Sequence, residues 1–289
     1  MQKMGERIEF SPDELVPEFG ASPVQPIRPT DDNARADHPI WTFRETIRGA
    51  LLTLVPWLAL AALNLLSSSQ TTPSKPLSPG VDIANAIFIF IVQVLLEGTF
   101  LIAPLWYAVF RPRRIAKRQG LPTPTLRQGF GALGFRAFRS WQGVAGVVLG
   151  LAGIYAVSVL YTLIAQAFNV QVQTNVDVLS KQAAVEPWTI LATLVAAVIV
   201  APFCEETFFR SYFFQGLRLR LSVWVAIVLS AIIFGIAHGD PGSLVLLIVI
   251  GIFLALLRWR TRSIWPGICL HMLNNLLSAL FVFQMLQFH

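Results

Sequence analysis

Six polar side chains in the last third of this 289-residue chain have the chemistry of an acid–base site. A carboxylate can take a proton from water, a neutral imidazole can orient or share that proton, and an asparagine amide can only form hydrogen bonds. All six lie in apolar runs, where such groups are costly and are functional candidates by default. They are Glu205, Glu206 and Arg210 in one run, His238 in a second, and His271 and Asn275 in a third.

Helical spacing separates the two glutamates by role. Glu206 and Arg210 are four residues apart and share one face of a helix, with the acid first, which favours an ion pair. This pair would keep Glu206 ionised and immobile. Glu205 points about 140° away from Arg210 and is the carboxylate left free for acid–base work. Two further pairs have the same spacing, Phe234 with His238 and His271 with Asn275.

The depth of these residues in the membrane gives an independent argument. At 1.5 Å per helical residue, measured from the basic loops, Glu205 lies about 20 Å deep, His238 about 24 Å, His271 about 12 Å and Asn275 about 18 Å. Helix tilt shifts each depth by several ångströms, so the four depths overlap. The sequence therefore predicts that the four side chains meet in one intramembrane cavity.

The composition supports a membrane location. Apolar residues make up 55% of the chain, charged residues only 13%, and the mean hydropathy is +0.62. A soluble globule needs about 25% charge, and a disordered chain is polar, so both classes are excluded. Two cysteines exclude a disulfide scaffold and a four-cysteine zinc site. We therefore expect an all-α, polytopic helical membrane protein that contacts the lipid bilayer.

The apolar runs are long enough to cross a bilayer, which takes about 20 residues. The fourth run is either one tilted helix or two pieces broken near Pro202, so the prediction is about seven to eight transmembrane helices. The runs are 49–67, 83–110, 141–168, 187–217, 222–238, 243–258 and 264–287.

Loop charges predict the orientation. Residues 111–139 contain eight basic residues and no acidic one, and basic loops stay in the cytoplasm. We expect a cytoplasmic N-terminus, in a bacterial inner (plasma) membrane. Although the isoelectric point is about 9.8, the basic residues lie between apolar runs, which favours topology signals over nucleic-acid binding.

The expected organisation has three parts. Residues 1–47 are rich in proline and acidic residues and are predicted to be a flexible cytoplasmic tail, without a signal peptide. Residues 48–180 are predicted to form the N-terminal transmembrane helices, with the basic cytoplasmic loop at 111–139. Residues 181–289 are predicted to form the catalytic membrane core.

The motifs Glu205-Glu206-x-x-x-Arg210, Phe234-x-x-x-His238 and His271-x-x-x-Asn275 resemble, in order, those of the CPBP intramembrane proteases. This family, the Abi group, includes CAAX prenyl endopeptidases and bacteriocin-processing relatives. The resemblance covers roughly residues 187–280 and implies a glutamic endopeptidase without a cofactor, acting on a membrane-associated protein or peptide. It further implies that Glu205 and His238 activate water. His271 and Asn275 would stabilise the oxyanion, with Glu206, Arg210 and Phe234 in support.

Other functions remain open on the residues alone. Glu205, His238 and His271 could bind zinc, although the compact His-Glu-x-x-His signature is absent. A proton-coupled transporter could use the same groups as a relay, and a non-catalytic scaffold would retain the helices. Cys204 is disfavoured as a nucleophile because a thiol in apolar surroundings is inert. Glu97, in an earlier span, is interpreted as an interhelical hydrogen-bonding group.

Overall fold

The computed structural model describes residues 39–67, 76–170 and 185–287, and in these ranges the chain forms helices and no strands. Residues 1–38 of the predicted tail lie outside the described residues. Helix α2 begins at Phe43, so the last part of the range predicted as tail is helical. The all-α fold class is confirmed.

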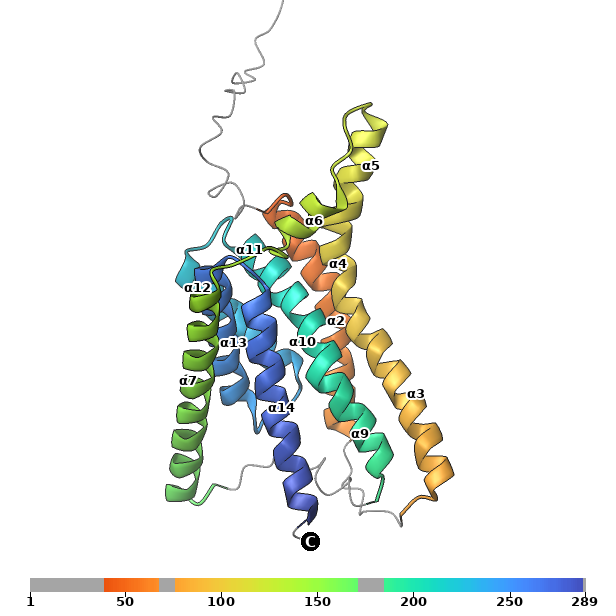
Figure 1. Cartoon of the computed structure of the whole chain (residues 1–289), viewed down its shortest axis with the longest axis vertical. Helices are drawn as coiled ribbons and strands as arrows, with labels where there is room; N and C mark the ends of the chain where they lie inside the picture. The colour runs from red at the N-terminus through yellow and green to blue at the C-terminus, as the bar shows by residue number, and fades with distance from the viewer. Residues whose placement is uncertain (1–38, 68–75, 171–184, 288–289) are drawn as a thin grey trace, which may run out of the picture. The chain divides into compact units, whose positions relative to one another are not determined.

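The helices follow one another with few long loops (Figure 1). In chain order they are α2 (Phe43–Ser67), α3 (Pro79–Gly98), α4 (Ile102–Leu105), α5 (Arg111–Arg118), α6 (Leu126–Ala132), α7 (Ser140–Ala167), α9 (Pro187–Val195), α10 (Ala201–Glu206), α11 (Phe214–Leu217), α12 (Val223–Ala237), α13 (Leu244–Thr261) and α14 (Trp265–Gln287).

Four helical runs in the described residues are long and apolar enough to cross a membrane. They establish a polytopic membrane protein, and each of the seven predicted spans falls on a helix; the total of seven or eight crossings stays a prediction. Helix α12 is apolar but has only 15 residues. The four runs are Pro79–Arg118, Ser140–Ala167, Pro187–Leu217 and Leu244–Thr261.

The basic segment 111–139 is less of a loop than predicted. Helix α5 continues the run from Pro79 without a break and carries the first five basic residues. Arginine and lysine have high helix propensity, so a change from apolar to basic residues does not end a helix. Helix α6 then begins after Thr125, whose hydroxyl accepts from Gln128 N while the Gln128 side chain accepts from Thr125 N.

The fourth predicted span is one uninterrupted helical run from Pro187 to Leu217. Pro202 does not break it. Instead, wider π-helical turns flank α10, at Ala196–Val200 before it and at Thr207–Phe213 after it. Such π turns absorb irregularities within a helix and are frequent at functional sites. The run therefore accommodates Pro202 by widening its turns on both sides of α10, and the helix does not end there.

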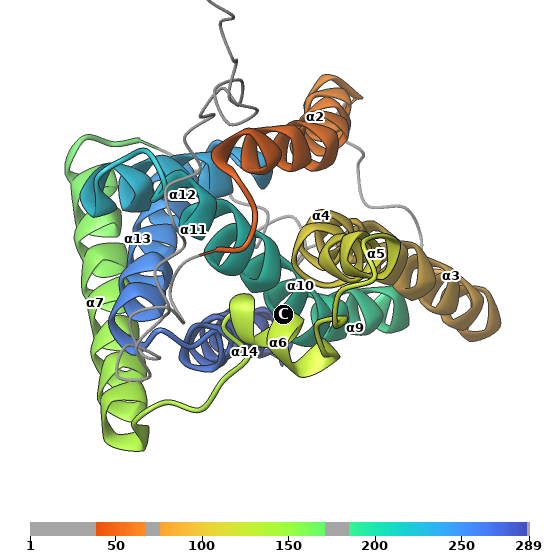
Figure 2. The same cartoon turned by 90° about the horizontal axis from the view of Figure 1, so that it is seen from above.

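This run lies at the centre of the helix assembly. Figure 2 shows α9 and α10 between α3 and α14, with α7, α12 and α13 forming a group to one side. From Thr207 to Leu217 every side chain is buried, which brings aromatic rings into the core. Phe208 and Phe209 contact Phe100 of the Pro79–Arg118 run, and Phe209 also contacts Phe234 of α12. Burial of these rings fixes the helix that carries the glutamates.

A buried carboxylate fixes the start of the same run. Asp82 of α3 accepts hydrogen bonds from the backbone N–H groups of Trp188 and Thr189, at 2.9 and 3.1 Å, and from the Thr189 hydroxyl at 2.7 Å. The first N–H groups of a helix have no partner within the helix. Asp82 supplies that partner from another helix and thereby holds α9 against α3.

Candidate active site

Glu205 is placed by α10, with its side chain almost completely buried. Its Oε2 lies 3.9 Å from Nε2 of His238 and 3.8 Å from Nε2 of His271. These separations exceed hydrogen-bond length and are those expected when one water bridges the groups. The structure therefore brings together Glu205, His238 and His271, three of the four side chains that the sequence predicted to share one cavity.

His238 is placed by the end of α12. The next residue, Gly239, adopts a positive φ of 61°, which ends the helix directly after His238. Its Nδ1 lies 2.7 Å from the backbone oxygen of Phe234. A carbonyl only accepts, so Nδ1 carries a proton, and in the neutral form of the ring the nitrogen that faces Glu205, Nε2, is unprotonated.

His271 lies between the two glutamates. Its Nδ1 is 3.2 Å from Oε1 of Glu206, and its Nε2 faces Glu205 on the other side. The carboxylate of Glu206 accepts the Nδ1 proton, so the neutral ring offers a lone pair at Nε2. His271 can donate a hydrogen bond from Nε2 only when it holds both protons. This link between Glu206 and His271 was not predicted from the sequence.

Glu206 and Arg210 form the ion pair that their spacing favours. Nη1 of Arg210 lies 3.0 Å from Oε1 of Glu206, and both side chains are at most 1% exposed. The guanidinium also lies 4.1 Å from the centre of the Phe234 ring, which gives the cation an aromatic face. Phe234 in turn packs against both histidine rings, with ring centres 4.5 Å from His238 and 5.7 Å from His271.

Gly267 of α14 leaves room for the Glu206 carboxylate beside His271. A Cβ atom at this position would lie 3.0 Å from Oε2 of Glu206. A larger residue there would require the Glu206 carboxylate to shift by a few tenths of an ångström. The sequence signal for this contact is only a glycine in the first turn of an apolar helix, and it was not recognised as part of the site.

Asn275 makes its contact with the backbone of the glutamate helix. Its Nδ2 donates to the oxygen of Ala197 at 2.9 Å. In the π register the partner of that oxygen would be the N–H five residues later, at Pro202, and proline has none. Proline therefore leaves the Ala197 carbonyl without a partner inside the helix, and Asn275 supplies one. In a regular α-helix, the carbonyl that lacks its partner would be that of Val198. Asn275 has no hydrogen bond to Glu205, His238 or His271 among the described contacts.

Two neighbours complete the surroundings. Glu97 lies close enough to interact electrostatically with Glu205 and Cys204, and its Oε2 is buried without a hydrogen bond among the described residues. The sequence interpretation of Glu97 as a hydrogen-bonding group between helices therefore stays a prediction. Cys204 is a buried free thiol on α10.

The histidines and Glu205 were also considered as zinc ligands. Within the described part of the chain, no three His, Cys, Asp or Glu side chains are arranged to hold a metal ion. Ligands at about 2.1 Å from a tetrahedral zinc lie about 3.4 Å from one another. Glu205 and the two imidazoles would have to move closer together to bind one.

Comparisons with known proteins match the segment of the chain that contains these side chains. Residues 187–277 match the family model of the type II CAAX prenyl endopeptidase Rce1-like proteins. Over 82 residues, the chain is 35% identical to a Bacillus subtilis (strain 168) protein named "Putative membrane peptidase YdiL". That match spans 28% of this chain and 34% of the relative. No solved structure matches. The resemblance to the CPBP proteases is thus supported over one segment, residues 187–277, which is similar to the Rce1-like CAAX proteases.

Proposed function

We propose that this chain is a glutamic endopeptidase of the membrane, which hydrolyses a peptide bond in a membrane-associated protein or peptide. The observation that carries the proposal is the position of Glu205, whose carboxylate faces the Nε2 atoms of two imidazoles at 3.8–3.9 Å. The family match of the same segment supports proteolysis as the reaction. The site needs no nucleic acid and no cofactor.

In this mechanism, water is activated between Glu205 and His238. Oε2 of Glu205 accepts one hydrogen bond from the water, and the unprotonated Nε2 of His238 accepts the other. The water oxygen bonds to the scissile carbonyl carbon as one proton passes to Glu205 and the C=O electron pair moves onto its oxygen. The C–N bond then breaks, and Glu205 returns its proton to the leaving amine.

The oxyanion is stabilised from α14. When both ring nitrogens of His271 carry a proton, its Nδ1 donates to Glu206 and its Nε2 donates to the developing negative charge. Asn275 has two Nδ2 hydrogens, of which one is used by Ala197 and the other is free to donate. Glu206, Arg210 and Phe234 support these groups by fixing His271 and its charge.

The activity is tested with purified protein in lipid vesicles. Membrane proteins from cells that lack this chain serve as the substrate pool, and new N-termini are measured by mass spectrometry. We expect a reproducible set of new termini that increases with time and enzyme concentration. A set identical to that of empty vesicles would contradict the proposal.

The same assay tests the oxyanion role of Asn275. Asn275→Ala is expected to lower the turnover rate about 10²–10³-fold, as for a lost oxyanion donor, with little change in KM. The matched control is Asn274→Ala, which removes a neighbouring amide bonded to the Asn275 side chain at 3.2 Å and should lose much less activity. If the two variants lose equal activity, Asn275 has only a packing role.

The zinc protease that would use Glu205, His238 and His271 makes the opposite prediction about metal. We expect purified active protein to hold no stoichiometric zinc by elemental analysis and to keep its activity through prolonged chelation. One zinc per chain, with activity lost on chelation and restored by zinc, would replace the metal-free mechanism. The assignment as a protease would survive that result.

We also propose that the protein lies in the bacterial inner membrane with its N-terminus in the cytoplasm. The support is the basic segment that includes α5, because positively charged segments remain on the cytoplasmic side. A cysteine introduced at Gln119, just beyond α5, should react with a membrane-impermeant thiol reagent only after the cytoplasmic face is opened.

A further inference from the structure

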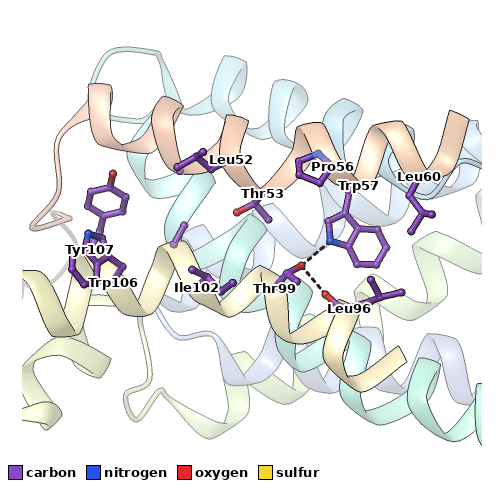
Figure 3. Close-up of a pocket in the computed structure, with 12 residues that line it drawn as sticks. Leu52, Thr53, Pro56, Trp57, Leu60, Leu96, Thr99, Ile102, Trp106 and Tyr107 are labelled. Carbon is purple, nitrogen blue, oxygen red and sulfur yellow. Dashed lines mark hydrogen bonds between the residues drawn. The ribbon is translucent and has the colours of Figure 1, made fainter. Parts of the chain in front are cut away.

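An apolar groove lies between α2 and the span formed by α3 and α4, on a different part of the protein from the glutamate site. Its volume is about 440 Å³, within the range of sites that hold one small molecule. Along α2 it runs from Gly49 to Leu60, about 17 Å at 1.5 Å per residue. Figure 3 shows Leu52, Pro56, Trp57 and Leu60 of α2 facing Leu96, Thr99, Ile102 and Trp106 across it.

The groove has a closed floor and open walls. Thr53, Ala103 and Tyr107 are buried at its base, whereas Leu52 and Ile102 are 71% and 66% exposed along its rim. In a membrane this rim faces lipid. An acyl chain of a neighbouring lipid can therefore enter from the side without any rearrangement of the helices.

The polar atoms at the deep end of the groove are already paired. Nε1–H of Trp57 donates to the Thr99 hydroxyl at 2.9 Å, and that hydroxyl donates to the Leu96 oxygen at 2.7 Å (Figure 3). A peptide or sugar bound there would lose its hydrogen bonds to water and find few replacements. The lining instead fits a hydrocarbon chain.

The other end of the groove is flanked by one arginine from each wall, Arg48 and Arg111, and by one glutamate, Glu45. Arg48 is exposed and lies one helical turn before Leu52, on the face of α2 that lines the groove. Arg111 follows the groove-lining Trp106 and Tyr107 and forms an ion pair with Glu45 of α2 at 2.7 Å. This ion pair ties the two walls together at the groove's end. An anionic group placed there would meet arginines from both walls.

We propose that this groove binds one acyl chain of an anionic phospholipid, with the lipid phosphate held at Arg48 and Arg111. The apolar part of the groove binds the acyl chain, and the arginines at its end favour an anionic headgroup. Each basic residue near an anionic membrane surface contributes about 1 kcal/mol to binding. A zwitterionic phospholipid carries the same phosphate, but its cationic headgroup opposes the attraction to the arginines. This site is separate from the proposed catalytic one, because Phe100 stacks on Trp57 and, with Phe208 and Phe209, forms an aromatic wall between them.

Trp57 makes the proposal measurable, because bromine on an acyl chain quenches a tryptophan that it touches. The protein is placed in vesicles that contain either brominated phosphatidylglycerol or brominated phosphatidylcholine at equal bromine content. We expect stronger quenching by the anionic lipid. Because Trp57 and Trp106 both line the groove, we expect the double variant Trp57→Phe, Trp106→Phe to remove that difference. Arg48→Gln should weaken the preference about fivefold, the factor for one lost arginine contact.

Matched variants decide where the preference arises. Leu52→Phe narrows the groove and should abolish the preference, whereas Val55→Phe, exposed on α2 but outside the groove, should retain it. Arg220→Gln makes the same charge change at an exposed position on another loop and should also retain it. Equal quenching by both lipids in the wild type would overturn the proposal and indicate ordinary boundary lipid. A preference unchanged by both Arg48→Gln and Leu52→Phe, or lost equally in Arg220→Gln, would overturn it too.

Discussion

Glu206→Gln is expected to lower the free energy of unfolding by about 3–5 kcal/mol, the loss found when one partner of a buried ion pair is removed. The variant leaves the guanidinium of Arg210, 1% exposed, without its counter-charge. It also weakens the acceptor for Nδ1 of His271. The measurement is chemical unfolding of the purified protein in mixed micelles, together with the folded yield.

The chain offers a matched control for this prediction. Arg111→Gln breaks the ion pair with Glu45, in which the Arg111 side chain is 37% exposed. Exposed pairs contribute at most about 1 kcal/mol, so this variant should remain close to the wild type. Equal, small losses in both variants would show that Glu206 and Arg210 do not hold the site together.

The two histidines should differ in what their removal costs. His238→Ala is expected to lower the rate of peptide hydrolysis by about 10²–10⁴-fold, the usual contribution of a positioned acid–base group. Its effect on stability should be small, because its side chain is 27% exposed and its hydrogen bond is to its own helix. His271→Ala should lower both rate and stability, since it removes a buried partner of Glu206. Rates come from the new N-termini in vesicles, and stability comes from chemical unfolding.

The prediction depends on a difference between the two variants: His271→Ala should lose stability and His238→Ala should not. Equal losses of stability would mean that His238 is also a packing residue. A normal rate in His238→Ala would leave Glu205 with His271 alone as its partner and would remove His238 from the water-activating step.

Much of the fold and part of the site could be predicted from the sequence, because both depend on simple periodicities. Apolar runs identified the helices, and a spacing of four residues identified Glu206 with Arg210. Overlapping depths predicted that Glu205, His238, His271 and Asn275 would come together. The structure places Oε2 of Glu205 3.8–3.9 Å from the Nε2 atoms of both histidines. The hydrogen bond of the Asn275 amide is to the Ala197 oxygen instead.

The other contacts of the site could not be predicted from the spacing of residues along a regular helix. The bond between Asn275 and the Ala197 oxygen arises from a π turn, which shifts the carbonyl freed by Pro202 by one residue. The reach of Glu206 to His271 depends on which faces of α10 and α14 meet, and on the missing side chain of Gly267. The helical extent of α5 depends on local propensity, which a hydropathy pattern does not report.

The most direct test of the central claim is Glu205→Gln in the vesicle assay. The amide keeps the size of the side chain but cannot take a proton from water, so we expect no new N-termini above background. The protein should remain folded and inserted. Cys204→Ala, which removes the neighbouring thiol on α10, is the matched control and should cleave at the wild-type rate. Proteolysis by Glu205→Gln at close to the wild-type rate would contradict the account.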